Sequence, residues 1–244
     1  MSGADEWHAL AAFTPARVAL GRAGSALPTR RVLEFQLAHA RARDAVNAPF
    51  DAAALAAELD AMCLTTKAAD RAAYLANPDL GRSLSDASRV GLARGAYDAA
   101  LIVADGLSAT AIRAHGAALA RAIRASLPEL AWAPVTVVTN GRIAVGDEIA
   151  QALGASLAVV AIGERPGLSA ADSVGLYLTW RPRPGVTRDA DRNCISNVRP
   201  DGLPLDEAAH RLAWLARQAR RLGASGVGLK EDAPERLTDE SARA

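Results

Sequence analysis

The pattern of apolar positions changes near residue 97. Before it, apolar residues recur at helical spacing and good N-cap residues precede the candidate helices. This pattern predicts helices over Arg30–Ala45, over Ala52–Met62 after the cap Asp51, and over Asp86–Arg94 after the cap Ser85. Beyond residue 97, short apolar runs typical of strands alternate with helical segments. We therefore predict a helical first part followed by an α/β part.

The alternating part predicts a sheet with helices between its strands. The expected strands are Ala99–Ala104, Val135–Thr139, Leu157–Ile162, Val174–Trp180 and a short last strand at Gly226–Leu229. The expected helices are Ala109–Ala125 after the cap Ser108, Asp147–Leu153 and Glu207–Leu222. Strand-helix-strand order is typical of parallel sheets, so we expect an α/β, Rossmann-like fold with a mainly parallel sheet and flanking helices.

These patterns divide the chain into three regions. A helical N-terminal region is expected over 1–97, an α/β domain over 98–230 and a polar tail over 231–244. With 244 residues, half of them apolar, the chain is long enough to bury a substantial core.

Charge and cysteine content narrow the class of protein. The net charge is +1 and the only lysines are Lys67 and Lys230, which leaves no broad basic field for nucleic acid. The only cysteines, Cys63 and Cys194, are too few for a disulfide framework and lack the spacing of a zinc site, which favours a reduced cytoplasmic compartment. No apolar run approaches the roughly 18 residues of a membrane span. We expect neither nucleic-acid nor membrane partners.

Two unusual segments follow predicted strands: GERPGL at 163–168 and DRNCISN at 191–197. We expect both on loops at one edge of the sheet, where open α/β folds place ligands. Glu164 is then held on a short, stiff loop and can accept hydrogen bonds from a large polar ligand. Alternatively, it is a surface residue paired with an arginine. Cys194 has no histidine nearby in the sequence, so by itself it is interpreted as structural.

The two segments resemble the small (light) subunit of ethanolamine ammonia-lyase, an adenosylcobalamin-dependent enzyme. Three further segments, LGRAG at 20–24, ADGLS at 104–108 and GRI at 141–143, look like signature segments of that family in the same order. The resemblance therefore extends from about Thr14 to about Leu229.

The resemblance implies a set of cofactor-contacting residues. Glu164, Cys194 and Ile143 match family positions that contact the cobalamin, although a core role also explains an isoleucine. Arg142 and Arg165 are candidates for the cofactor's phosphate, with exposed or interface arginines as the alternative. Asp105 is a candidate anion or amide site next to the helix cap Ser108. No Asp-x-His-x-x-Gly string is present, which favours base-on cobalamin.

The resemblance also implies what the protein does. It is expected to join a large catalytic subunit in a higher-order heteromer that converts ethanolamine into acetaldehyde and ammonia. The large subunit holds the substrate, and this chain has no catalytic residues or metal ligands of its own. The expected location is the cytoplasm, or a bacterial microcompartment if the host makes one. Two alternatives are a non-catalytic scaffold homologue and a stand-alone nucleotide-binding α/β enzyme, the latter disfavoured because no phosphate-binding glycine loop is present.

Overall fold

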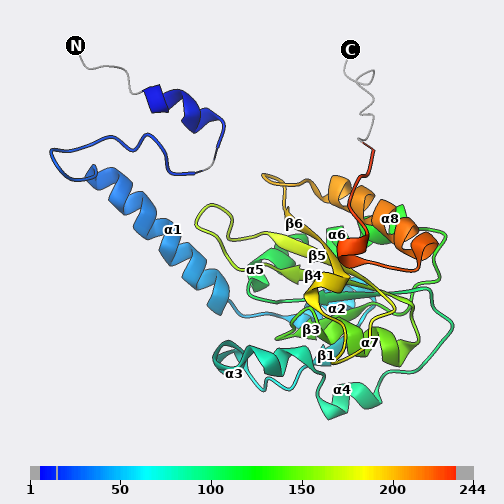
Figure 1. The fold of residues 1–244 in the computed structure, drawn as a ribbon. Coiled ribbons are helices and arrows are strands. Elements are labelled where there is room, and N and C mark those ends of the chain that lie inside the picture. The colour runs from blue at the N-terminus through cyan, green and yellow to red at the C-terminus, as the bar shows by residue number, and fades with distance from the viewer. Residues whose placement is uncertain (1–5, 15, 235–244) are drawn as a thin grey trace.

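Six strands form one sheet in the order β1-β3-β2-β4-β5-β6 (Figure 1). The protein is described by a computed structural model that covers residues 6–14 and 16–234. The strands are β1 (Met62–Thr65), β2 (Ala99–Ala104), β3 (Thr136–Thr139), β4 (Leu157–Gly163), β5 (Val174–Trp180) and β6 (Arg192–Val198). Strands β2 and β4 are buried along their whole length, as expected for the centre of a sheet that is covered on both faces.

The sheet is mixed, which corrects the expectation of a Rossmann-like, mainly parallel sheet. Strands β1, β3, β2 and β4 run parallel, but β5 is antiparallel to both β4 and β6. The connections at 164–173 and 181–191 explain this difference. Each is about ten residues long and contains no α-helix, whereas a parallel crossover needs a dozen or more residues. The α/β class itself is confirmed.

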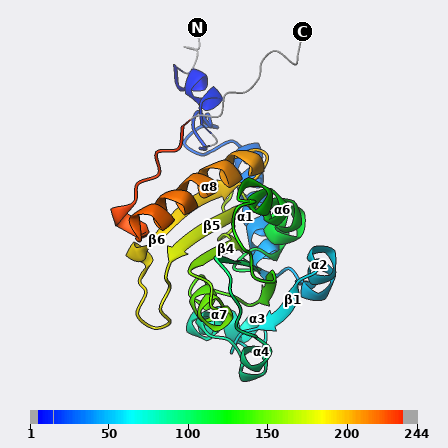
Figure 2. The same ribbon diagram turned by 90° about the vertical axis from the view of Figure 1, so that its right-hand side faces the viewer.

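Helices cover both faces of the sheet (Figure 2). One apolar cluster joins the sheet to α2, α6 and α8, and a second joins its other face to α7. The α-helices are α1 (Thr29–Asn47), α2 (Ala52–Leu59), α3 (Arg71–Ala76), α4 (Asp86–Val90), α5 (Ala109–Ala111), α6 (Ala117–Ser126), α7 (Val145–Leu153) and α8 (Leu205–Leu222). A π-helical segment, Ile112–Gly116, joins α5 to α6, so the single helix predicted over Ala109–Ala125 contains a local widening. Short 3-10 helices lie at Glu6–Ala12, Pro78–Arg82, Asp189–Asp191 and Gly226–Gly228.

Two other local predictions are wrong. The helix expected over Ala52–Met62 ends at Leu59, because Asp60 adopts a left-handed φ of +50° and Met62 begins β1. The region before residue 97 is therefore not purely helical, since β1 pairs with β3 at the edge of the sheet. The strand expected at Gly226–Leu229 is instead a 3-10 turn in which the Leu229 N–H donates to the Gly226 carbonyl.

Helix α1 projects away from the sheet (Figure 1). Ala45 is its only buried residue, and the apolar side chains of Val32, Leu33, Phe35 and Leu37 are all exposed. An isolated 19-residue helix is only marginally stable in water, so most helices of this length rely on packing. The long exposed apolar surface of α1 is therefore a candidate contact surface for a partner.

A buried ion pair joins α7 to β6. The Arg192 guanidinium donates to both carboxylate oxygens of Asp147 at 2.7 Å, and to the Thr179 hydroxyl at 2.9 Å. The two charged side chains are only 3% and 2% exposed. The bidentate geometry satisfies the Asp147 carboxylate. Through Arg192 it connects helix α7 with strands β5 and β6.

Candidate functional site

The candidate site is a pocket at the carboxyl ends of the parallel strands β2, β3 and β4. The loops that follow these strands converge there, as the position of sequence segments 104–108, 141–143 and 163–168 predicted. The pocket has a volume of about 420 Å³. It is lined by Tyr74, Gly106, Leu107, Arg142, Ile143, Ile162, Gly163, Glu164, Arg165 and Tyr177.

Two glycines allow these loops to approach one another closely. Gly106 has a φ of +53°, and a Cβ there would lie 2.3 Å from the Gly163 carbonyl oxygen. A Cβ on Gly163 would lie 2.4 Å from the Asp105 carbonyl oxygen. Both contacts are with backbone atoms, so neither can be relieved by a side-chain movement. The loops after β2 and β4 therefore touch through their backbones, and this contact fixes one wall of the pocket.

Glu164 lies directly after β4, as predicted from the sequence. Its N–H donates to the Ser173 carbonyl at 3.0 Å, which holds the start of the loop, and its carboxylate Oε2 accepts the Asn197 N–H at 3.1 Å. The side chain extends over Gly175, where a Cβ would lie 3.1 Å from Glu164 Oε1. Glu164 is thus held by a backbone donor rather than paired with an arginine, and no ion pair involving it is found in residues 6–14 and 16–234.

Ile143 and Arg142 enter the same pocket from the loop between β3 and α7. Ile143 is half-buried and packs against the apolar cluster under α7, so it has both a core face and a pocket face. The Arg142 N–H donates to the Gly81 carbonyl at 2.7 Å, and Arg142 lines the pocket together with Tyr74. The exposed Arg165 follows Glu164 on the opposite wall. The pocket therefore has an apolar wall with one carboxylate and two guanidinium groups at its edge.

Cys194 lies within strand β6 and not on a loop, which corrects the sequence-based placement. The segment 191–197 is polar because β6 is an edge strand whose outward positions are exposed. Cys194 does not line the pocket. It pairs across the sheet with Tyr177, which does line the pocket. Desolvation and the nearby Glu164 carboxylate raise the pKa of the Cys194 thiol, which disfavours a thiolate nucleophile.

Asp105 holds two of the pocket loops in register. Its buried carboxylate accepts the Gly141 N–H at 3.1 Å and lies 3.5 Å from Nη1 of Arg71. The same Nη1 donates to the Gly106 carbonyl at 2.7 Å, while Nε of Arg71 donates to the Val46 carbonyl at 2.8 Å. Arg71 therefore connects the end of α1 to the floor of the pocket. This network supports a positioning role for Asp105.

The ionisation of Asp105 gives a pH-dependent prediction. Burial raises its pKa from 3.8 to about 6, although Arg71 acts in the opposite direction. The Asp105 carboxyl therefore binds a proton more tightly in the folded state than in the unfolded chain. The contribution of this protonation to the free energy of unfolding is fully present below pH 3.8 and is lost as the pH rises through about 6. Relative to Asp105→Asn, the free energy of unfolding of the unmodified chain should increase by about 1 kcal/mol from pH 7 to pH 5. Urea denaturation of both proteins tests this, and parallel pH profiles would contradict it.

Two tyrosines of the pocket were not singled out from the sequence. Tyr74 comes from α3 and donates to the Gly141 carbonyl at 3.2 Å, a contact between residues 67 positions apart that no local pattern reveals. Tyr177 had a weak signal, because it interrupts the apolar run of β5 on the same face as Gly175. His115 is half-buried outside the pocket, with Nε2 3.4 Å from the Asp172 carboxylate.

Other site types find no support in the part of the chain that the structure describes. Within it, no group of three or more histidine, cysteine or acidic side chains is arranged to hold a metal ion. Among its helices, none combines the length and the apolar character needed to cross a membrane.

Comparisons with known proteins agree on one family. The family model described as ethanolamine ammonia-lyase light chain matches residues 4–230. Relatives described as ethanolamine ammonia-lyase small subunit include one from Ralstonia nicotianae, 51% identical over 98% of this chain and 93% of the relative. Another, from Pseudomonas fluorescens, is 50% identical over 94% of this chain and 88% of the relative. A third, from Xanthomonas campestris pv. campestris, is 50% identical over 98% of this chain and 93% of the relative. The chain therefore belongs to the small-subunit, or light-chain, family of the lyase ethanolamine ammonia-lyase.

Proposed function

We propose that this chain is the small subunit of an adenosylcobalamin-dependent ethanolamine ammonia-lyase and that its strand-end pocket holds one edge of the cobalamin. The enzyme would convert ethanolamine into acetaldehyde and ammonia. The observation that carries the proposal is the meeting of Ile143 and Glu164 in one pocket, with Cys194 paired across the strands with the lining residue Tyr177. Ile143 and Glu164 come from loops that follow two different strands, and Cys194 lies on β6 beside Tyr177 without lining the pocket itself.

The residues present fit a corrin edge. Cobalamin carries apolar methyl groups and amide side chains around its ring, and the pocket offers Leu107, Ile143 and Ile162 beside the acceptor Glu164. A whole cobalamin is much larger than a pocket of about 420 Å³, which supports a cofactor shared with a second chain. None of the pocket-lining side chains in the described residues is a histidine, which supports base-on binding.

The role of this chain would be binding and enclosure. When bound, adenosylcobalamin supplies radical chemistry that no amino-acid side chain provides. Glu164 would accept hydrogen bonds from cobalamin amides, Ile143 would contact the apolar rim, and Arg142 and Arg165 would face the cofactor's phosphate. Covering this side of the ring would also keep water away from reactive intermediates. Substrate binding is assigned to the large subunit.

The proposed division of the chain follows the same argument. Residues 98–230 would supply most cobalamin contacts, although Tyr74 of the first region also lines the pocket, and the region 1–97 would pack on the large subunit through α1, whose apolar side chains are exposed. Residues 235–244, most of the predicted polar tail, lie outside the described residues. Several copies of each subunit would form the heteromer, in the cytoplasm or in a microcompartment if the host makes one.

A cofactor titration tests the shared pocket. Adenosylcobalamin binding, followed by absorbance, should be weak for the small subunit alone and much tighter when the large subunit is added. Glu164→Ala should weaken binding by the complex about tenfold or more, because a hydrogen bond to a charged group contributes about 1.5–3 kcal/mol. Glu164→Gln is the matched variant, since it keeps an acceptor oxygen and should lose less.

Three results would contradict the proposal. Equally tight cobalamin binding with and without the large subunit would rule out a shared pocket. Ethanolamine turnover by the large subunit alone would support the scaffold alternative. Turnover that depends on an added nucleotide would support the stand-alone enzyme instead.

A further inference from the structure

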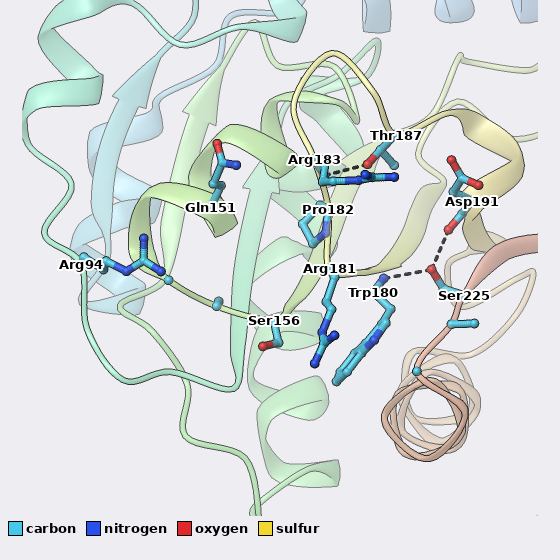
Figure 3. A pocket seen from close by; sticks show the side chains of 14 residues that line it. Arg94, Gln151, Ser156, Trp180, Arg181, Pro182, Arg183, Thr187, Asp191 and Ser225 are labelled. Carbon is cyan, nitrogen blue, oxygen red and sulfur yellow. Dashed lines mark hydrogen bonds between the residues drawn. The ribbon is translucent and has the colours of Figure 1, made fainter.

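A second, larger hollow lies at the opposite end of the sheet, where β4 begins and β5 ends (Figure 3). It has a volume of about 660 Å³ and is bordered by the end of α7, the residues after β5 and the turn after α8. Strand β4 separates it from the candidate cobalamin pocket, a distance of roughly 20 Å for seven residues at about 3.3 Å per residue. We call it the arginine hollow, after Arg94, Arg181 and Arg183.

The three arginines are available to a ligand. All are exposed, and in residues 6–14 and 16–234 none of them forms an ion pair with a carboxylate. Arg181 lies over the ring of Trp180, with its guanidinium carbon 5.6 Å from the ring centroid. Figure 3 shows Arg181 between Ser156 and Trp180, with Arg94 across the hollow. Three cations around one concave surface, without paired acids, favour an anionic occupant.

The indole of Trp180 provides a separate indication of a missing acceptor. Its Nε1 is buried, and in the described part of the chain it has no hydrogen-bond partner. An indole N–H can only donate, so no rearrangement of its own can satisfy it. Buried donors without partners are rare in folded proteins. An oxygen atom of a bound ligand would supply the acceptor.

Acceptors of the protein itself are scarce in the hollow. Asp191 is the one acidic side chain among the described lining residues, and its Oδ2 already accepts the Arg188 N–H at 2.8 Å. The Ser225 hydroxyl is also used, since it accepts the backbone N–H of Trp180 at 2.9 Å and donates to the Asp191 carbonyl at 2.6 Å. The described lining thus has three guanidinium groups and a single carboxylate.

The backbone positions Arg181 at a conformational cost. Arg181 has a left-handed φ of +46°, held by its N–H, which donates to the Ser156 carbonyl at 2.7 Å. Such a conformation is unfavourable for a non-glycine residue and tends to persist where the surroundings require it. Gly154, the left-handed C-cap of α7 with a φ of +82°, approaches this segment closely, because a Cβ there would lie 2.9 Å from the Gly95 carbonyl oxygen and 3.1 Å from Arg94 Cγ.

We propose that the arginine hollow binds the phosphate group of a small molecule, at a site distinct from the candidate cobalamin pocket. Guanidinium groups bind phosphate oxygens through paired hydrogen bonds, and the indole N–H of Trp180 adds a further donor. The volume exceeds that of free phosphate and lies within the range for organic ligands, and Pro182 and the Trp180 ring offer apolar surface. The expected ligand is therefore a phosphate ester. This inference is independent of the proposed cobalamin role.

Phenyl phosphate and inorganic phosphate are the probes. Binding to the purified chain, measured by calorimetry, should be saturable for phenyl phosphate with a Kd below about 1 mM, a free energy of about −4 kcal/mol. Arg181→Gln should weaken it about tenfold, and Trp180→Phe, which replaces the indole and its N–H with a smaller aromatic ring, about threefold. Arg41→Gln is the control, because Arg41 is an exposed arginine on α1. Unchanged thermal unfolding midpoints would show that the variants are folded.

The outcomes separate the possible ligands. Tighter binding of phenyl phosphate than of inorganic phosphate supports a phosphate ester as the ligand. Equal binding of the two probes supports free phosphate as the ligand instead. No saturable binding of either probe overturns the proposal, as does an equal loss in Arg41→Gln. Tighter binding of a glutamate-rich peptide than of phenyl phosphate also overturns it, because the hollow would then receive a protein carboxylate.

Discussion

Arg192→Met should lower the free energy of unfolding by about 3–5 kcal/mol, because it leaves the buried Asp147 carboxylate without its partner. Domains of ordinary stability have about 5–15 kcal/mol in total, so this single change would remove a large fraction. The Thr179 hydroxyl cannot compensate, since one neutral group does not replace a bidentate guanidinium. Urea denaturation of the purified chain measures the effect.

Two matched variants make this expectation specific. The double variant Asp147→Leu with Arg192→Met removes both charges and should recover much of the lost stability. Arg121→Met breaks an exposed pair with Glu58 by the same substitution and should cost less than about 1 kcal/mol. A loss below about 1 kcal/mol for Arg192→Met would show that the buried pair does not hold α7 and β6 together.

Placing two carboxylates on α1 should prevent assembly with the large subunit while leaving the fold intact. Leu33 and Leu37 lie four residues apart on one face of α1 and are 58% and 52% exposed, so Leu33→Asp with Leu37→Asp removes little packing within this chain. If both side chains are buried against a partner, each contributes about 1.5–3 kcal/mol, and their combined loss weakens the complex by about 100-fold or more. Co-elution of the two subunits in gel filtration, with adenosylcobalamin present, measures assembly.

Val90→Asp is the control for this experiment. Val90 is an equally apolar residue, 88% exposed at the end of α4, on a part of the molecule away from α1 (Figure 1). The control should assemble normally. Normal assembly of the α1 variant, or equal loss in both variants, would contradict the role of α1 as the docking helix.

The local signals in the sequence predicted most of the second half of the fold. Strands β2 and β5 have the predicted bounds, because continuous apolar runs identify buried strands. Caps were equally informative, since the side chains of Asp51, Ser85 and Ser108 accept the N–H groups that they were expected to accept. Interactions between residues close in the sequence were sufficient to predict these strands and helix starts.

The errors have a different origin. Strand β1 has four residues and follows α2 after a two-residue turn, so its pattern merges with that of the helix. Strand β6 is polar because it is an edge, and no periodicity distinguishes it from a loop. The pocket shows the same limit, because Glu164 and Ile143 were found from motifs, whereas Arg71 and Tyr74 reach the site through tertiary contacts.

The antiparallel run from β4 to β6 has an evolutionary consequence. The 164–173 connection turns beside the candidate cobalamin pocket, whereas the 181–191 connection turns at the other end of the strands, beside the arginine hollow. Insertions, deletions or substitutions in the 181–191 turn would thus alter the second surface without disturbing the first. What the chain recognises at the far end of the sheet can consequently change through this turn alone, while the candidate cobalamin pocket keeps its shape.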